Sequence, residues 1–345
     1  MTIKESIICT GIDEYAIDAD KRFSYLPKAG DVALFEIISI GKHKAMQDVS
    51  KRNVALFPGD RILAAFGNRY ATSQFEGYVP AECREEYHML AQGGVVGLVR
   101  SAHVSMPEPT VVKILGYAVD PGGRVINTVY HRKQAAWFTG RVPDGAKIIL
   151  SLGASMDSGK TTTAGYLIRG LKAIGKRVAY LKLTGTVYTK DRDFCGDCGA
   201  DYVADFSNLG FPSTYLCKEE ELLDLYQTLL NGAAEAFPDY IVVEVADGLY
   251  QRETNALLRN KAFTDTVHKV IFSALDSIGA VAGSHYLATL GLPPLAVSGR
   301  FTMSPLLMEE VKSACPVRSA ALEEIASPDF ARTVDAAEAA QLVAR

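Results

Sequence analysis

The residues with the clearest chemical potential lie near the middle of the chain, directly after an apolar run. Residues 147–152 read KIILSL, and the loop that follows reads GASMDSGKTTT over residues 153–163. Its part from Ala154 to Thr161 matches the pattern GxxxxGK[ST], with alanine in the first position. A helix-length segment follows, so the sequence predicts a strand, a tight loop and a helix in the order that this pattern requires.

This loop has the groups that hold a polyphosphate. Gly159 lets the backbone turn close to phosphate oxygens, and the amide groups at the start of the next helix favour an anion. Lys160 would reach the β and γ phosphates, and the Thr161 hydroxyl would hold Mg²⁺. We therefore predict a nucleoside triphosphate site, and a glycine turn without a ligand is the alternative. The residues expected at the nucleotide are Ala154, Ser155, Met156, Asp157, Ser158, Gly159, Lys160, Thr161 and Thr162.

Three further charged residues accompany other apolar runs of the same half. Lys182 lies near the end of RVAYLKL, and Glu244 and Asp247 lie within and directly after YIVVEVA. If these runs are parallel strands, their carboxyl ends meet at the crevice where such sheets bind ligands. Lys182 would add positive charge beside the phosphates, and the carboxylates would bind a metal or orient a water, unless they are merely a solvated strand end. The predicted catalytic residues are Lys160, Lys182, Glu244 and Asp247.

The segments GASMDSGKTT, KLTGT at 182–186 and VVEVADG at 242–248 together resemble the dethiobiotin synthetase and cobyrinic acid amidation group of P-loop proteins. The resemblance extends over about residues 146–320 and is closest to bacterial members that carry an additional amino-terminal domain. It implies that Lys182 neutralises the substrate acid and phosphate and that Glu244 binds Mg²⁺. The chain has EVADG where that family has EGAGG, which implies a different substrate pocket.

The resemblance also implies a second Mg²⁺ ligand in the connection after the second strand, here residues 184–206. We take Asp193 as that ligand, although the choice stays open among Asp191, Asp193, Asp197 and Asp201. The connection is polar and long, which is typical of a functional loop and also of a solvated one. The lysine that marks dimeric partitioning ATPases is absent from positions 155–158, which disfavours a partitioning switch.

The two halves of the chain differ in their patterns. From about residue 30 to 131, short apolar runs are separated by turns such as PGD and DPGG, which favours a barrel or sandwich with one helix near 80–92. After residue 145, apolar runs alternate with helix-length segments, as in a mainly parallel sheet covered by helices. We predict an α/β protein with a β-rich domain over 1–143 and a P-loop NTPase domain over 144–345; RVINTVYH and PVRSA are each expected to form a strand.

Other groups suit two interpretations each. The aromatic loop at 65–80 carries Arg69, and it could stack on a base or simply pack on its own rings. Arg252 and Arg259 suit transition-state stabilisation or an exposed helix face equally. Cys195 and Cys198 have ligand spacing, but no second pair accompanies them at zinc-site spacing, so free thiols are expected.

Composition limits the partners. The chain has 345 residues, of which 48% are hydrophobic, and a net charge of −4, which gives no general attraction to nucleic acid or anionic lipid. No apolar stretch reaches membrane-spanning length and the first residues lack a secretory pattern, so we expect a cytoplasmic protein without a membrane partner. The sequence leaves open whether the chain forms a homodimer.

These observations predict an ATP-dependent enzyme that uses Mg²⁺ and phosphoryl transfer to activate an unidentified small-molecule acceptor, as a synthetase, ligase or kinase. ATP is expected rather than GTP because no NKxD pattern follows the later strands, where FSALDS offers Asp276 alone. One alternative is a polynucleotide 5′-hydroxyl kinase, which the acidic net charge disfavours. The other is a regulatory NTPase whose β-rich domain is an interaction module.

Overall fold

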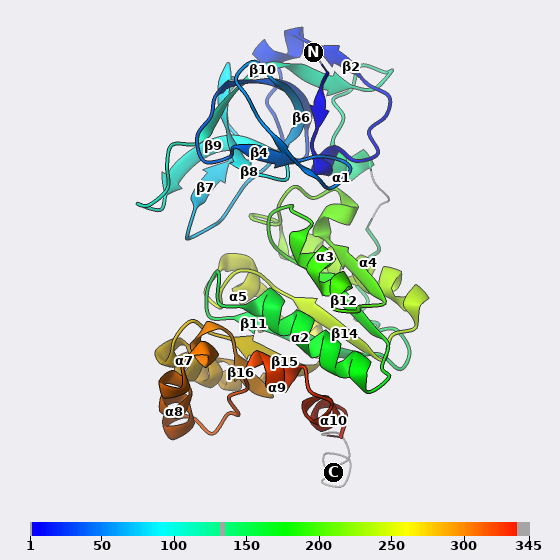
Figure 1. Cartoon of the computed structure of the whole chain (residues 1–345). Helices are drawn as coiled ribbons and strands as arrows, with labels where there is room; N and C mark the ends of the chain where they lie inside the picture. The colour runs from blue at the N-terminus through cyan, green and yellow to red at the C-terminus, as the bar shows by residue number, and fades with distance from the viewer. Residues whose placement is uncertain (1, 132–134, 337–345) are drawn as a thin grey trace. The chain divides into compact units, whose positions relative to one another are not determined.

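The computed structural model describes residues 2–131 and 135–336. The chain forms two compact units, which Figure 1 colours by residue number. The first comprises Met1–Ala135, Gly185–Thr189 and Phe206–Cys217, and the second comprises Ala136–Thr184, Lys190–Asp205 and Lys218–Arg345. Two short segments from the second half of the sequence therefore belong to the first unit.

The second unit is built on a six-stranded sheet in which every neighbouring pair is parallel. Apolar, β-branched residues form these strands; in YIVVE at the centre every side chain is buried. In order across the sheet the strands are β13 (Tyr202–Asp205), β12 (Val178–Lys182), β14 (Tyr240–Glu244), β11 (Lys147–Gly153), β15 (Val267–Ser273) and β16 (Ala296–Ser298). The predicted α/β class with a parallel sheet is thus confirmed.

Helices connect and cover these strands. They are α2 (Lys160–Ala173), α3 (Lys190–Asp197), α4 (Glu219–Ala233), α5 (Arg252–Arg259), α6 (Lys261–Thr264), α7 (Ser277–Thr289), α8 (Pro305–Ala314), α9 (Leu322–Ile325) and α10 (Pro328–Ala336). The apolar face of α2, with Leu167 and Ile168, packs in one core with Ile149 of β11, Tyr180 of β12 and Val242 of β14. This packing fixes the start of α2, and with it the loop after β11, at the carboxyl edge of the sheet.

The first unit is mainly β-structure. Its strands are β1 (Lys4–Glu5), β2 (Ala16–Asp18), β3 (Val32–Ser39), β4 (Ala45–Gln47), β5 (Asn53–Ala55), β6 (Arg61–Phe66), β7 (Phe75–Tyr78), β8 (Glu86–Ala91), β9 (Val95–Ala102) and β10 (Thr110–Val119), followed by the short helix α1 (Thr128–His131). Five of them close into a ring in the order β6, β3, β10, β8, β9, because β9 also pairs with β6. Phe35, Phe66, Tyr87 and Tyr117 fill its core.

Four expectations about single elements are wrong. The helix expected near 80–92 is strand β8, because Tyr87 and Met89 alternate with more exposed residues and so follow the two-residue period of a strand. RVINTVYH ends in helix α1, and PVRSA contributes an isolated bridge at Ser319 instead of a strand. The connection 184–206 is not one long loop, since it contains α3 and β13.

Within the described ranges, no helix is long and apolar enough to cross a bilayer.

Candidate nucleotide site

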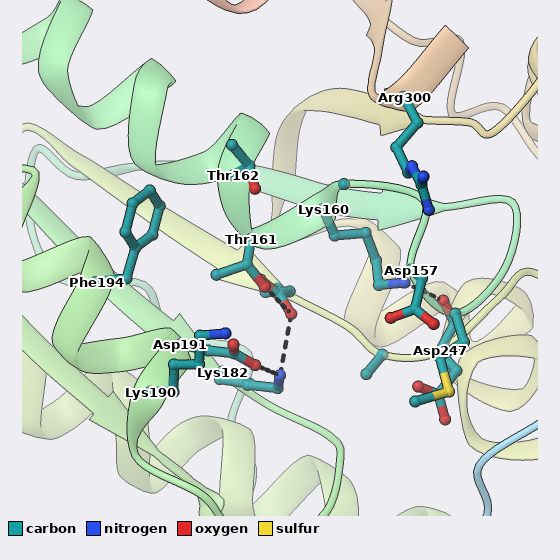
Figure 2. Close-up of a pocket in the computed structure, with 14 residues that line it drawn as sticks. Asp157, Lys160, Thr161, Thr162, Lys182, Lys190, Asp191, Phe194, Asp247 and Arg300 are labelled. Atoms are coloured by element: carbon teal, nitrogen blue, oxygen red, sulfur yellow. Dashed lines mark hydrogen bonds and ion pairs between the residues drawn. The ribbon is translucent and has the colours of Figure 1, made fainter. Parts of the chain in front are cut away.

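A cavity of about 620 Å³ lies at the carboxyl edge of the parallel sheet (Figure 2). It is open to solvent, and both cationic and anionic side chains face it. The lining residues are Met156, Asp157, Gly159, Lys160, Thr161, Thr162, Lys182, Lys190, Asp191, Phe194, Glu244, Ala246, Asp247 and Arg300. All of them belong to the second unit, and they come from the ends of β11, β12, β14 and β16 and from α2 and α3.

The loop between β11 and α2 has backbone conformations that most residues do not readily adopt. Asp157 and Gly159 both have left-handed φ angles, of 61° and 103°. At Gly153 an added Cβ would lie 2.2 Å from Ser158 Oγ and 2.7 Å from Lys160 Cγ, so a side chain there would displace the loop. No described side chain caps the first turn of α2, whose amides are therefore available to an anion. The geometry fits a phosphate group.

Lys160 is folded back over this loop. Its Nζ donates to the carbonyl oxygen of Ser155 at 2.8 Å and to that of Asp247 at 2.5 Å. Burial lowers the pKa of Lys160, and the nearby Glu244 and Asp247 charges partly oppose this effect. A phosphate would give this buried ammonium the counter-charge that carbonyl groups supply only in part.

Lys182 lies between two carboxylates at the end of β12, with 13% of its side chain exposed. Its Nζ forms ion pairs with Asp191 and, at 3.2 Å, with Glu244 Oε1 (Figure 2). Burial acts to lower the pKa of Lys182, but the charges of Asp191 and Glu244 outweigh it and raise that pKa. Burial acts to raise the pKa of Asp191. The charge of Lys182 outweighs this effect, so the pKa of Asp191 lies below its ordinary value. Lys182 and Asp191 are thus held in their charged forms.

Glu244 connects this ion pair to the phosphate loop. Its Oε1 accepts the Thr161 hydroxyl at 3.2 Å, and its Oε2 accepts the Tyr180 hydroxyl at 2.9 Å. The described residues contain no cluster of three or more His, Cys, Asp or Glu side chains suited to a metal. Mg²⁺ does not need such a cluster, because at nucleotide sites it takes one or two protein oxygens together with phosphates. The oxygens of Thr161 and Glu244 fit that requirement.

The segment after β14 packs closely on the phosphate loop. Thr184 Oγ1 donates to the Ala246 carbonyl at 2.7 Å and accepts the Ala246 amide at 2.8 Å. At Gly248 an added Cβ would come within 2.6 Å of the Ala154 carbonyl oxygen. These contacts place Asp247 at the cavity wall, where its backbone accepts Lys160.

The structure brings most of the predicted site residues together. Lys160, Lys182, Glu244 and Asp247 line one cavity, together with Met156, Asp157, Gly159, Thr161 and Thr162 of the loop. Ala154, Ser155 and Ser158 belong to the same loop but do not line the cavity. Of the four aspartates, Asp191 lines it, whereas Asp193, the residue chosen as a metal ligand, does not. Asp193 is two residues further along helix α3 than Asp191, which turns its side chain to a different face, and sequence spacing did not resolve this difference.

Arg300 is the main residue that the sequence interpretation missed. Neither Arg252 nor Arg259 lines the cavity; they pair with Glu253 and Asn255 on α5 instead. Arg300 follows β16, and its amide donates to the Ser158 carbonyl at 3.2 Å. Arg300 could have been identified from the sequence, because SGR ends the apolar run that forms β16. The carboxyl ends of all parallel strands lie at one edge of the sheet.

Two of the weaker candidates have structural roles. Arg69 is buried, donates to the Leu90 carbonyl and donates to Gln74 Oε1 at 2.8 Å. The rings of Tyr70 and Tyr78 both pack on Tyr215, so the aromatic residues of the loop at 65–80 have packing partners outside the loop. Cys195 and Cys198 are buried free thiols on α3, and burial raises the pKa of both.

No protein-family model matches the chain, and no curated protein matches it. Solved structures align with parts of it. A ParA family ATPase from Chlorobium tepidum is 11% identical, with a TM-score of 0.32, over 51% of this chain and 83% of that one. The signal recognition particle 54 kDa protein from Aeropyrum pernix, in complex with GDP, is 19% identical, with a TM-score of 0.36, over 59% of this chain and only 50% of that protein.

The signal recognition particle receptor FtsY from Elizabethkingia anophelis, in complex with GDP, is 15% identical, with a TM-score of 0.38, over 58% of this chain and 70% of that one. Likenesses this limited decide nothing about activity. The second unit has a parallel sheet, a glycine-bearing loop between β11 and α2 and a buried acid at the end of β14, and this arrangement fits the P-loop fold.

Proposed function

We propose that the chain is an ATP-dependent enzyme that, with Mg²⁺, transfers a phosphoryl group to a small-molecule acceptor and so activates it. The observation that carries the proposal is the position of Lys182. Its ammonium lies beside the phosphate loop on a side chain that is only 13% exposed, and it is bracketed by Asp191 and Glu244. A site that only holds nucleotide needs the loop and Mg²⁺, whereas a second fixed cation suits charge that develops on a transferring phosphoryl group.

Phosphoryl transfer requires mainly positioning and charge neutralisation from the protein. Bound at Thr161 and Glu244, Mg²⁺ would neutralise charge on the phosphate oxygens. Lys160 would exchange the Ser155 and Asp247 carbonyls for phosphate oxygens, and Lys182 would face the transferred group. Asp191, kept ionised by Lys182, would accept a hydrogen bond from a hydroxyl or amine of the acceptor and orient it.

Room for an acceptor supports an enzyme with two substrates. Helix α3 contributes Lys190, Asp191 and Phe194 to the cavity wall, beyond the residues of the phosphate loop. Lys190 offers a positive charge and Phe194 an apolar ring on the same side of the helix, four residues apart. This combination suits an acceptor with an acid group on a small apolar body, such as a carboxylate. Its oxygen would take the γ-phosphoryl group as ADP leaves, and phosphate would be the leaving group of the resulting acyl phosphate.

ATP is the nucleotide that we propose. The one acidic residue after β15 that could read a guanine base is Asp276, and its Oδ1 accepts the Gly279 amide at 2.6 Å as the N-cap of α7. That role fixes the carboxylate at the helix start.

A regulatory NTPase is the second candidate, favoured by one observation. Residues 185–189 lie between Lys182 and Asp191 in sequence, yet they belong to the first unit, where Gln47 Nε2 donates to Thr189 Oγ1 at 2.8 Å. A change in the position of Lys182 would therefore move residues 185–189, which belong to the β-rich unit.

One set of turnover measurements separates the candidates. ATP consumption is measured for the protein alone, with a pool of small carboxylic acids and amines, and with 5′-hydroxyl RNA. Stimulation by a small acid, with a phosphorylated or condensed product, is the expected result. Label on RNA would support a polynucleotide kinase, and turnover that neither addition changes would support a regulatory NTPase. GTP in place of ATP tests the nucleotide.

A further inference from the structure

Tyr180 lies beneath the site and has no part in the chemistry described so far. It does not line the cavity, and its ring is fully buried in the core between β12 and α2. Tyr180 and Lys182 are two residues apart on β12, so their side chains lie on the same face of the sheet. Lys182 stands opposite Glu244 in the parallel pairing of β12 with β14, and both side chains therefore reach one carboxylate.

The two oxygens of that carboxylate have different partners. Glu244 Oε1 lies 3.2 Å from Thr161 Oγ1 and 3.2 Å from Lys182 Nζ, on the cavity side. Glu244 Oε2 accepts the Tyr180 hydroxyl at 2.9 Å, on the core side. The terminal torsion of a glutamate has a broad energy minimum, so a carboxylate held at one oxygen alone can rotate. The second hydrogen bond removes this freedom.

We propose that Tyr180 is a positioning residue that fixes the Glu244 carboxylate, so that Oε1 faces the divalent cation bound with the nucleotide. The inference rests on the proposed function, because that function requires the cation. Tyr180 acts through Glu244 and does not itself contact the nucleotide. Hydrogen bonds from outside a metal's ligand set orient the ligands, and their removal typically weakens metal binding 10- to 100-fold.

The test is Tyr180→Phe, which removes the hydroxyl and keeps the ring. Binding of a non-hydrolysable ATP analogue is measured by calorimetry across a Mg²⁺ titration. We expect the Mg²⁺ concentration for half-maximal enhancement of binding to rise about 10-fold. Binding of the analogue without Mg²⁺ is expected to stay unchanged, because the phosphate loop is intact.

A matched control exists in the same unit. Tyr226 on α4 is also fully buried, and its hydroxyl pairs with Thr266 Oγ1 at 2.9 Å, away from the cavity. Tyr226→Phe should lower the melting temperature by an amount similar to that for Tyr180→Phe and leave the Mg²⁺ requirement unchanged.

The outcomes are distinguishable. If both variants keep the Mg²⁺ requirement of the unaltered protein, the positioning role is wrong and the Tyr180 hydroxyl only stabilises the core. A requirement raised in Tyr180→Phe alone supports the role. If the unaltered protein shows no enhancement of nucleotide binding by Mg²⁺, the proposed function fails first, and this inference fails with it.

Discussion

The charges of Asp191 and Glu244 keep Lys182 protonated. Lys182→Ala is expected to lower kcat far more than nucleotide affinity, because its proposed role lies at the transferring phosphoryl group. Steady-state kinetics and equilibrium binding of a non-hydrolysable analogue measure the two quantities separately. Loss of both to the same extent would contradict the role.

The same substitution has a second consequence. Without the ammonium, Glu244, whose side chain is 1% exposed, loses its ion-pair partner, and breaking a buried ion pair costs about 3 to 5 kcal/mol. The control is Lys172→Ala, which removes a pair with Asp201 of 2.7 Å whose side chains are 31% and 32% exposed. Its expected cost is about 0 to 1 kcal/mol. Denaturant unfolding of the two variants compares these free energies.

Lys160 belongs to the phosphate loop itself. Lys160→Ala is expected to reduce ATP turnover at least about 100-fold, since it removes a cation from the β and γ phosphates. The fold should persist, because in the part of the chain that the structure describes the hydrogen bonds of Lys160 Nζ go to the backbone carbonyls of Ser155 and Asp247. Circular dichroism checks the fold, and a folded variant with normal turnover would refute the site.

Residue-level prediction from the sequence succeeded where a motif fixes backbone and side chain together. The phosphate loop, Lys182 and Glu244 follow from a pattern and from strand ends. Asp191 and Arg300 depend on which face of a helix or which wall of a cavity a side chain meets, and spacing alone does not supply that information. A cavity forms from elements distant in sequence, so only the assembled sheet reveals it.

Among the elements, the turn from β11 into α2 leaves little room for an added side chain. Gly153→Ala is expected to abolish nucleotide binding, because its Cβ would meet Ser158 Oγ at 2.2 Å and the Lys160 side chain at 2.7 Å. Gly196→Ala, on α3, is the control, since its Cβ would meet only Val203, at 3.8 Å. Calorimetry with ATP and Mg²⁺ should show binding in the control and none in Gly153→Ala.

Most strands of the parallel sheet were predictable because each of them is an apolar run. Helices α2, α4, α7 and α8 occupy helix-length segments among these runs. Strand β8 could not be predicted. CREEYHMLAQ mixes charged and apolar residues, and both helical and strand periods fit so short a run. Strand β13 was hidden inside a polar connection for the same reason.

On the scale of the whole molecule, a single cut does not separate the two units. Residues 185–189 and 206–217 belong to the first unit, where Val187 and Phe206 are each only 1% exposed. A fragment of residues 144–345, bounded as the sequence predicts, leaves these apolar side chains without the rest of their unit. We expect it to aggregate or bind a hydrophobic dye more strongly than the full chain, as gel filtration and fluorescence would show.

Residues 1–143 supplied in trans should reverse that behaviour. A monomeric fragment with no added dye binding would show that both segments are stable without the β-rich unit.

The divided first unit also has a consequence for biosynthesis. A ribosome makes the strands of the ring first, but the unit still lacks Gly185–Thr189 and Phe206–Cys217 until Cys217 has emerged from the exit tunnel. By then β11, α2 and β12 have already been translated. The nascent β-rich unit therefore cannot complete its final packing before the phosphate loop has been translated.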